Sequence, residues 1–343
     1  MSKHKCIYCL KEKEESEFNR EHVIPRMMGT YTNSFVLSNF QVCKECNSYF
    51  SKELEDKISL NSMESFLRMK YGRPMSDGRK LKKDRVSFIG AEGLFKGLEF
   101  TPIVDKANDE KISLYIPPQI GIMTNESPLA YQYYTLDALP EATPEVLSRL
   151  RNKSNGIITF DIPEAKATPC LMRKGYLGDH SSYSNPPLAD LFKDDAFLAH
   201  IKISIDSIVR RLCAKTVFNY ICYSLGKDYV LSGKFSALRD YIRNGTWSND
   251  LWFRYSQGPV SSVDMPNETA HVVGYMFYPG NRHGELCGCL TWFGQITYIF
   301  KLCDTDDAVN NVIVDPPTRM AYFNNDDATI TEDNSPFPFP KDS

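Results

Sequence analysis

The chain has 343 residues, of which 42% are hydrophobic and 24% are charged. This is the composition of an ordinary soluble globular protein, and no apolar run approaches the roughly twenty residues that span a bilayer. The formal net charge of −3 excludes a protein that coats polyanions through overall charge, although a local basic patch can still bind nucleic acid. A chain of this length is expected to form two domains.

The first residues, MSKHKC, carry no apolar run behind their charges, which predicts that there is no secretory signal. A cytoplasmic protein is therefore expected. In such a reducing compartment, the ten cysteines should be ligands or free thiols rather than disulfides.

Four of the cysteines form two C-x2-C pairs, Cys6 with Cys9 and Cys43 with Cys46. A turn of this kind holds two thiolates on one side, as two corners of a tetrahedral zinc site require. Two such turns close a four-sulfur shell with no open position, which is typical of structural zinc. The alternative is four buried free cysteines that pair by spacing alone.

The residues around the second pair predict a short run of elements in chain order. A strand over Phe18–Pro25 is followed by a loop with Gly29 and by a second strand over Phe35–Val42. An amphipathic helix then runs from Lys44 to about Lys70, because its apolar residues recur near helical spacing. The zinc would clamp the ends of this segment, which is too small to bury much core by itself.

Glu21-His22-x-x-Pro25, Asn39 before the second cysteine pair and Asn47 directly after Cys46 occur in this frame. Their order and spacing resemble the zinc-knuckle branch of the HNH endonucleases, which have a ββα-metal core, over about residues 6–60. The resemblance implies that His22 is the general base and that Asn39 braces the loop that orients it. It also implies that Glu21 and Asn47 bind a catalytic Mg²⁺ or Mn²⁺. Two departures are Glu21, where many members have Asp, and Asn47, where many have His.

The same residues suit phosphodiester hydrolysis on chemical grounds. A neutral histidine can deprotonate water at cytoplasmic pH, and one carboxylate with one amide oxygen suits the largely hydrated Mg²⁺ ion. Taken singly, each residue has a simpler explanation. His22 alone would be structural, Asn39 and Asn47 would be turn or cap residues, and Glu21 would be a surface charge.

A basic connection with the first strands of the next domain is predicted over residues 73–110. Its cations contact backbone phosphate in one interpretation and are only solvated surface in the other. These cations are Arg79, Lys80, Lys82, Lys83 and Arg85, and Arg26, next to Pro25, is a further candidate for phosphate contact.

The region from 111 to 323 predicts an α+β domain, and the acidic, Pro-rich residues 324–343 predict a frayed tail. The long helix of the region from 111 to 323 is expected over Asp195–Leu225. Shorter helices are expected after Thr143 and over Phe235–Ile242. Strands are expected at Arg85–Ile89, Leu98–Val104, Ile112–Ile116, Ile120–Thr124, Tyr131–Thr135, His271–Tyr278, Cys287–Phe293 and Ile296–Leu302.

The sequence thus predicts an α+β protein, with a small zinc-stabilised ββα-metal module (1–72) before a larger α+β domain of antiparallel strands and one long helix. The expected function is a metal-dependent DNA endonuclease of bacterial defence or restriction, with structural Zn²⁺ and no membrane partner. RNA as substrate and a homodimer are left open. One alternative is a zinc-knuckle module that binds nucleic acid without cutting it. Another is a nuclease effector that a small molecule or protein activates through the second domain.

Overall fold

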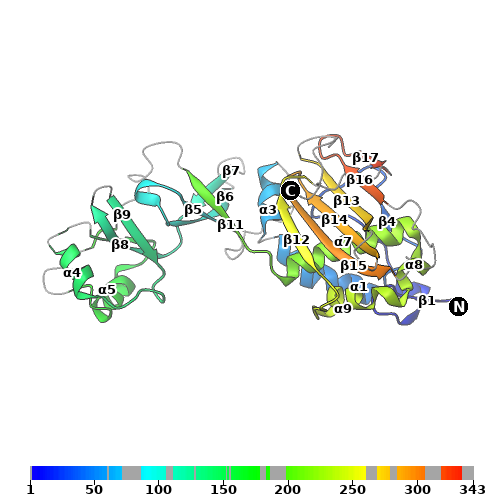
Figure 1. The fold of residues 1–343 in the computed structure, drawn as a ribbon, viewed down its shortest axis with the longest axis horizontal. Helices are drawn as coiled ribbons and strands as arrows, with labels where there is room; N and C mark the ends of the chain where they lie inside the picture. The colour runs from blue at the N-terminus through cyan, green and yellow to red at the C-terminus, as the bar shows by residue number, and fades with distance from the viewer. Residues whose placement is uncertain are drawn as a thin grey trace. The chain divides into compact units, whose positions relative to one another are not determined.

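A computed structural model describes residues 2–59, 62–71, 86–105, 111–126, 129–151, 153, 156–177, 183–185, 198–259, 269–278, 284–305 and 318–333. The chain forms two compact units, Met1–Ser76 with Ile205–Ser343, and Asp77–Ser204 (Figure 1). Helices and antiparallel sheets occur in both, so the predicted α+β class is confirmed. The predicted domain 111–323 includes parts of both units.

The amino-terminal module begins with the hairpin of β1 (Lys3–Lys5) and β2 (Glu12–Glu14), which the turn η1 (Glu15–Glu17) follows. A second hairpin pairs β3 (Glu21–His22) with β4 (Val36–Leu37). The helix predicted over 44–70 is divided into α1 (Lys44–Phe50), the π-helical turn η2 (Ser51–Glu55), α2 (Asp56–Ser59) and α3 (Met63–Lys70). The order strand, loop, strand, helix is therefore the predicted one.

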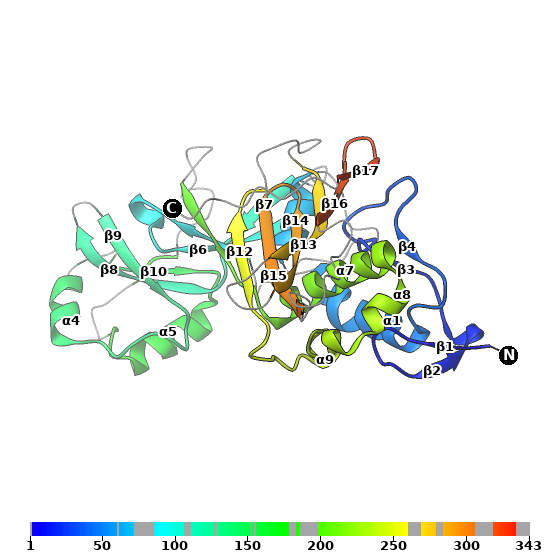
Figure 2. The same ribbon diagram turned by 45° about the vertical axis from the view of Figure 1, so that its right-hand side comes forward.

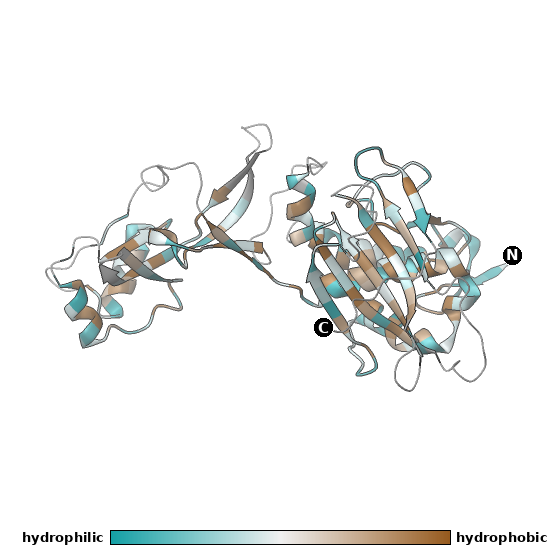
Figure 3. Ribbon diagram, turned by 45° about the horizontal axis from the view of Figure 1, so that its top comes forward, coloured by the Kyte–Doolittle hydropathy of each residue, from teal (hydrophilic) through white to brown (hydrophobic). Residues whose placement is uncertain are grey.

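A six-stranded antiparallel sheet forms the other part of this unit, in the order β12-β15-β14-β13-β16-β17. Its strands are β12 (Phe253–Gln257), β13 (His271–Tyr278), β14 (Gly284–Trp292), β15 (Ile296–Thr305), β16 (Thr318–Phe323) and β17 (Ile330–Asp333). The strand predictions at β13, β14 and β15 are confirmed, and apolar residues follow these central strands in Figure 3. β17 lies inside the stretch that was predicted to be a frayed tail, and it pairs with β16 over four residues.

The central helix α7 (Ser207–Leu225) packs on strands β13, β14 and β15, and also contacts η2, α2 and β4 of the amino-terminal module (Figures 1 and 2). Because it has the sheet on one side and the module on another, α7 is buried almost all round over Arg211–Cys222. The prediction of one helix over 195–225 is wrong at its start. Ala199–Ile203 is strand β11, and α7 begins where the Asp206 side chain accepts hydrogen bonds from the amides of Ile208 and Val209.

Short helices complete the first unit after α7. Gly226, at φ 90°, ends α7, and α8 (Lys227–Leu231), the turn η4 (Gly233–Phe235) and α9 (Ser236–Asn244) follow. The predicted helix over Phe235–Ile242 is confirmed as α9, which ends at Gly245 in the left-handed conformation.

The module is joined to the sheet by buried polar contacts as well as by α7. The His271 ring of β13 accepts from the Phe293 amide at 3.0 Å through Nδ1, so its Nε2 donates to the Met28 carbonyl at 3.1 Å. The Tyr298 hydroxyl of β15 donates to Glu64 of α3 at 2.6 Å. These contacts connect residues more than two hundred positions apart in the chain.

The described residues of the second unit form two small antiparallel sheets and two helices. One sheet has the order β11-β5-β6-β7, with β5 (Val86–Gly90), β6 (Glu99–Asp105) and β7 (Lys111–Tyr115). The other has the order β10-β8-β9, with β8 (Gln119–Glu126), β9 (Leu129–Tyr134) and β10 (Ile157–Phe160). The remaining elements are the turn η3 (Gly93–Phe95) and the helices α4 (Pro144–Leu150) and α5 (Glu164–Arg173). The strands predicted at β5 to β9 and the helix after Thr143 are confirmed, whereas α5 and β10 were not predicted.

Across the part of the chain that the structure describes, no helix combines the length and the apolar character that crossing a membrane requires.

Candidate active site

The four cysteines of the two C-x2-C pairs meet at one point of the amino-terminal module. The Sγ atoms of Cys6, Cys9, Cys43 and Cys46 all lie within 4.8 Å of one another, and all four thiols are free. Zn–S bonds of about 2.3 Å place the corners of a tetrahedron about 3.8 Å apart. The Cys9 and Cys43 sulfurs are separated by 3.8 Å, so the cluster has the dimensions of a four-sulfur zinc site.

The backbone around this cluster supports thiolate ligands. The Cys43 amide donates to Cys6 Sγ at 3.4 Å. A hydrogen bond from Cys46 lowers the pKa of Cys6 to about 5, and backbone amides contribute to this although burial opposes it. The same hydrogen bond raises the pKa of Cys46, and burial raises that of Cys43, so Cys6 is the most readily deprotonated of these three sulfurs. Three of the cysteines are buried and Cys9 is half-buried, which fits a closed structural site rather than an open catalytic one.

His22 lies on the short strand β3, where it pairs with Val36 of β4. Its ring is half-buried and makes no hydrogen bond to the described residues. Burial lowers the pKa of His22, and the positive charges of Arg26 and Arg20 lower it further. The imidazole is therefore neutral near pH 7 and has a nitrogen free to accept a proton.

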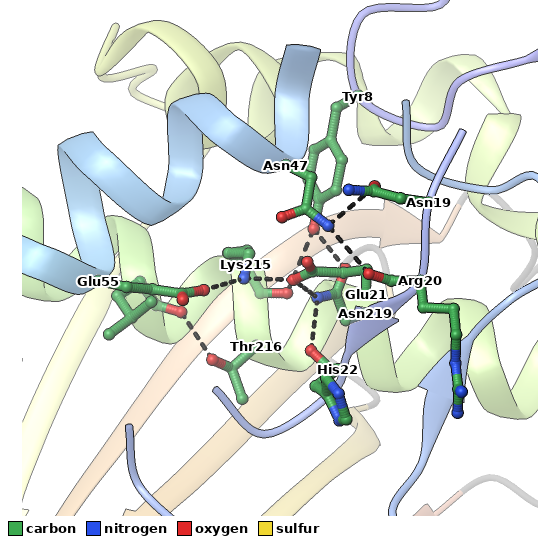
Figure 4. Close-up of polar contacts among 11 residues, drawn as sticks. Tyr8, Asn19, Arg20, Glu21, His22, Asn47, Glu55, Lys215, Thr216 and Asn219 are labelled. Carbon is green, nitrogen blue, oxygen red and sulfur yellow. Dashed lines mark hydrogen bonds and ion pairs between the residues drawn. The ribbon is translucent and has the colours of Figure 1, made fainter. Parts of the chain in front are cut away.

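Glu21 is buried and belongs to a polar cluster with residues of α7. Its Oε1 forms an ion pair with Lys215 Nζ and accepts a hydrogen bond from Asn219 Nδ2 at 3.0 Å (Figure 4). Lys215 is completely buried and also pairs with Glu55 Oε1 of η2 at 2.6 Å. Burial lowers the pKa of Lys215, but the charges of Glu21 and Glu55 outweigh this and raise it, so the side chain is an ammonium ion.

Asn47 lies on the first turn of α1 and faces the residues that precede β3. Its Nδ2 donates to Asn19 Oδ1 and to the Arg20 carbonyl, each at 3.0 Å (Figure 4). These two bonds leave Oδ1 of Asn47 without a hydrogen bond from the described residues. Glu21 Oε2 likewise accepts none. One carboxylate oxygen and one amide oxygen are thus left to bind a ligand, and this pair of donors fits a hard, partly hydrated divalent cation.

Two of the other predicted residues, Asn39 and Arg26, are described, and neither makes a hydrogen bond or an ion pair with the described residues of this group. Asn39 is exposed, its amide donates to Gln41 Oε1, and its side chain makes no hydrogen bond to a described residue. Its bracing role stays a prediction. Arg26 is exposed, and its charge acts on His22. Arg79, Lys80, Lys82, Lys83 and Arg85 lie outside the described residues.

Several residues of the site were not predicted from the sequence. Arg20 is exposed two positions before His22, directly before β3, and its charge acts on the His22 ring. Glu55, Lys215 and Asn219 surround Glu21, and the Tyr8 hydroxyl donates to Asn219 Oδ1 at 2.6 Å. The spacing of Arg20 to His22 was a usable signal. For Lys215 and Asn219, the signal was only that polar residues recur four positions apart in the helix, among the apolar residues Leu212, Val217, Phe218 and Ile221.

Residues 6–63 match the family model of the HNH endonucleases. The matched segment contains all four cysteines, both strands of the β3–β4 hairpin and the helical run from α1 to the start of α3. The resemblance inferred from the Glu21-His22 motif and the two cysteine pairs is therefore confirmed for this module. Neither a curated protein nor a solved structure matches the chain.

Proposed function

We propose that this chain is a divalent-metal-dependent endonuclease that hydrolyses phosphodiester bonds of DNA, with His22 as general base. One observation carries the proposal. A half-buried imidazole, kept neutral by burial and by Arg26 and Arg20, lies on β3 inside the segment that matches the HNH endonucleases, and its ring nitrogens bond to no described residue.

In the proposed reaction, His22 takes a proton from the attacking water. Arg20 and Arg26 are exposed next to it and make no ion pair with the described residues, so they can bind phosphate oxygens. Glu21 Oε2 and Asn47 Oδ1 would hold Mg²⁺ or Mn²⁺, which would polarise the phosphate and stabilise the leaving oxygen. The four-cysteine centre would hold Zn²⁺ only to shape the module, because a closed shell leaves no position for substrate.

We further propose a role in defence or restriction against foreign DNA. The support is the organisation of the chain, in which the nuclease module shares one unit with the six-stranded sheet while residues 77–204 form a unit of their own. Such a separate unit is available for target selection.

The test is cleavage of plasmid DNA and of a labelled RNA with Mg²⁺ or Mn²⁺, by the wild type and by His22→Ala. Loss of a general base typically lowers the rate by about 10²–10⁴-fold. DNA binding and zinc content should be unchanged, since the His22 ring bonds to no described residue. The comparison variant Asn47→Ala should also lose activity but regain part of it at high metal concentration, whereas His22→Ala should not.

Three results would contradict the proposal in different ways. Cleavage by His22→Ala at the wild-type rate would show that His22 is not the general base. DNA binding without cleavage would favour the binding-module alternative. Cleavage of RNA alone would change the substrate but keep the chemistry.

A further inference from the structure

Helix α7 presents a row of residues to the nuclease module at intervals of four. Lys215 contacts Glu21 and Glu55, and Asn219 contacts Glu21 and the carbonyl of His22 (Figure 4). One turn further, the Tyr223 ring stacks on Phe35 with centroids 4.4 Å apart. Residues spaced by four lie on one face of a helix, so this face of α7 runs along the β3–β4 hairpin.

Burial of Lys215 and Asn219 is costly unless every polar atom finds a partner. Both side chains are fully buried, and polar groups of the amino-terminal module bind to both of them. Asn219 Nδ2 donates to Glu21 Oε1 at 3.0 Å and to the His22 carbonyl at 3.4 Å, and its Oδ1 accepts from Tyr8. In other proteins, apolar residues of similar volume often replace a buried ion pair with no loss of stability, so stability alone is a weak reason for a buried Lys215.

Strand β3 needs support of this kind. It has two residues, and among the described residues its strand partner is β4, also of two residues. A pair of strands this short is marginal by itself. The zinc centre holds the segments before and after the hairpin. The α7 contacts instead reach Glu21 and His22 themselves, at the side chain of one and the backbone of the other.

We propose that Lys215 and Asn219 are positioning residues of the nuclease site, which α7 thereby completes from outside the segment that matches the family. This inference rests on the proposed function. Lys215 and Asn219 hold Oε1 of Glu21 and leave Oε2 for the cation, and Asn219 fixes the backbone that carries the general base. A displacement of about 1 Å at such a site costs about 10²-fold in rate.

The experiment uses the full chain with two changes at the cluster. Asn219→Leu removes both hydrogen bonds to β3 without altering charge. Lys215→Met combined with Glu55→Gln removes the ammonium and one of its two carboxylate partners, which keeps the net charge of the cluster. The matched control is Thr216→Val, because Thr216 is equally buried on α7 but, among the described residues, its hydroxyl bonds only to the Leu212 carbonyl of its own helix.

Two quantities are measured for each variant. The first is kcat and KM for DNA cleavage, where we expect kcat to fall by about tenfold to a hundredfold with KM unchanged. The second is hydrogen exchange of the amides around β3, above all that of Val23, which donates to the Phe35 carbonyl at 3.0 Å. Exchange there should accelerate in both cluster variants and not in Thr216→Val, while zinc content stays at the wild-type level.

The outcomes separate the two proposals. If kcat and exchange in the cluster variants equal those of Thr216→Val, the positioning role is wrong. If KM rises and kcat does not fall, the two residues act on binding and the inference is also wrong. If the wild type cleaves no nucleic acid, the proposed function fails, and hydrogen exchange still decides whether Lys215 and Asn219 hold β3.

Discussion

Two buried clusters hold the hairpin that carries His22, and they do so by different physics. The cysteine centre joins residues 6–46, and a metal ion would supply most of its binding energy. The lysine cluster, Lys215 with Glu21, Glu55 and Asn219, joins positions 160 to 198 apart. It depends on the burial of α7 between the module and the sheet.

Because the two clusters are held together differently, substitutions in them should cause different defects. Loss of one cysteine opens a shell whose closure the small module requires, so the defect is one of folding. Loss of the lysine should leave the sheet, α7 and the cysteine centre in place, so the expected defect is one of local charge and geometry. Substitutions in the cysteine centre should therefore impair folding of the module, whereas substitutions in the lysine cluster should change the charge and geometry of its site.

The largest expected effect is that of Cys43→Ser. Because a structural zinc site contributes about 10–16 kcal/mol in small zinc domains, its loss should unfold the amino-terminal module and abolish activity. Metal analysis should show about one zinc per chain in the wild type and none in the variant. Limited proteolysis should cut the variant within residues 6–63. The control is Cys170→Ser on α5, where the thiol donates to the Leu136 carbonyl. This substitution should change neither the zinc content nor the proteolysis of residues 6–63.

A smaller effect is expected for Lys215→Met alone. Removal of one partner from a buried ion pair typically costs about 3–5 kcal/mol, here because Glu21 stays buried beside Glu55. Burial raises the pKa of Glu21 already in the wild type, and Glu55 adds to this while Lys215 opposes it. Without Lys215 the carboxyl should protonate more readily. Protonation removes the unpaired charge, so the stability deficit should shrink as pH falls.

Denaturant unfolding at several pH values measures this deficit. A second substitution, Glu55→Gln, should recover part of the stability at neutral pH, since it removes the repulsion between the two carboxylates. A deficit that is independent of pH and unaffected by Glu55→Gln would show that the loss comes from a cavity rather than from charge.

The sequence predicted the cysteine cluster because its members are close in the chain and their spacing has one dominant chemical meaning. The β3–β4 hairpin followed from the same local segment, and β13 to β15 followed from long apolar runs. These are features whose physical cause lies within a few neighbouring residues. His22 was singled out because the motif around it lies between the two cysteine pairs.

The lysine cluster could not be predicted because its partners are distant in the chain. Lys215 stands among apolar residues of α7, and no neighbouring position indicates Glu21 or Glu55 as its partner. The start of α7 was mispredicted for a different reason. Leu198, Ile201 and Ile205 continue a helical apolar spacing, but Ala199–Ile203 pairs with β5, and the Asp206 cap was the local signal for the true start.

The smallest expected effect concerns the pH dependence of His22, on which the flanking arginines act more strongly than Glu55 and Lys215 of the lysine cluster. Since burial, Arg26 and Arg20 all lower the pKa of His22, the neutral base should persist to a lower pH than for an ordinary histidine. The acid limb of kcat/KM should accordingly lie below pH 6.5, the ordinary pKa of a histidine side chain. Arg26→Gln removes a positive charge that disfavours protonation, so it should move that limb to higher pH. Arg254→Gln, which changes the net charge of the chain equally at an exposed position on β12, should leave it in place. An acid limb that does not respond to Arg26→Gln would mean that the group titrating in catalysis is not His22.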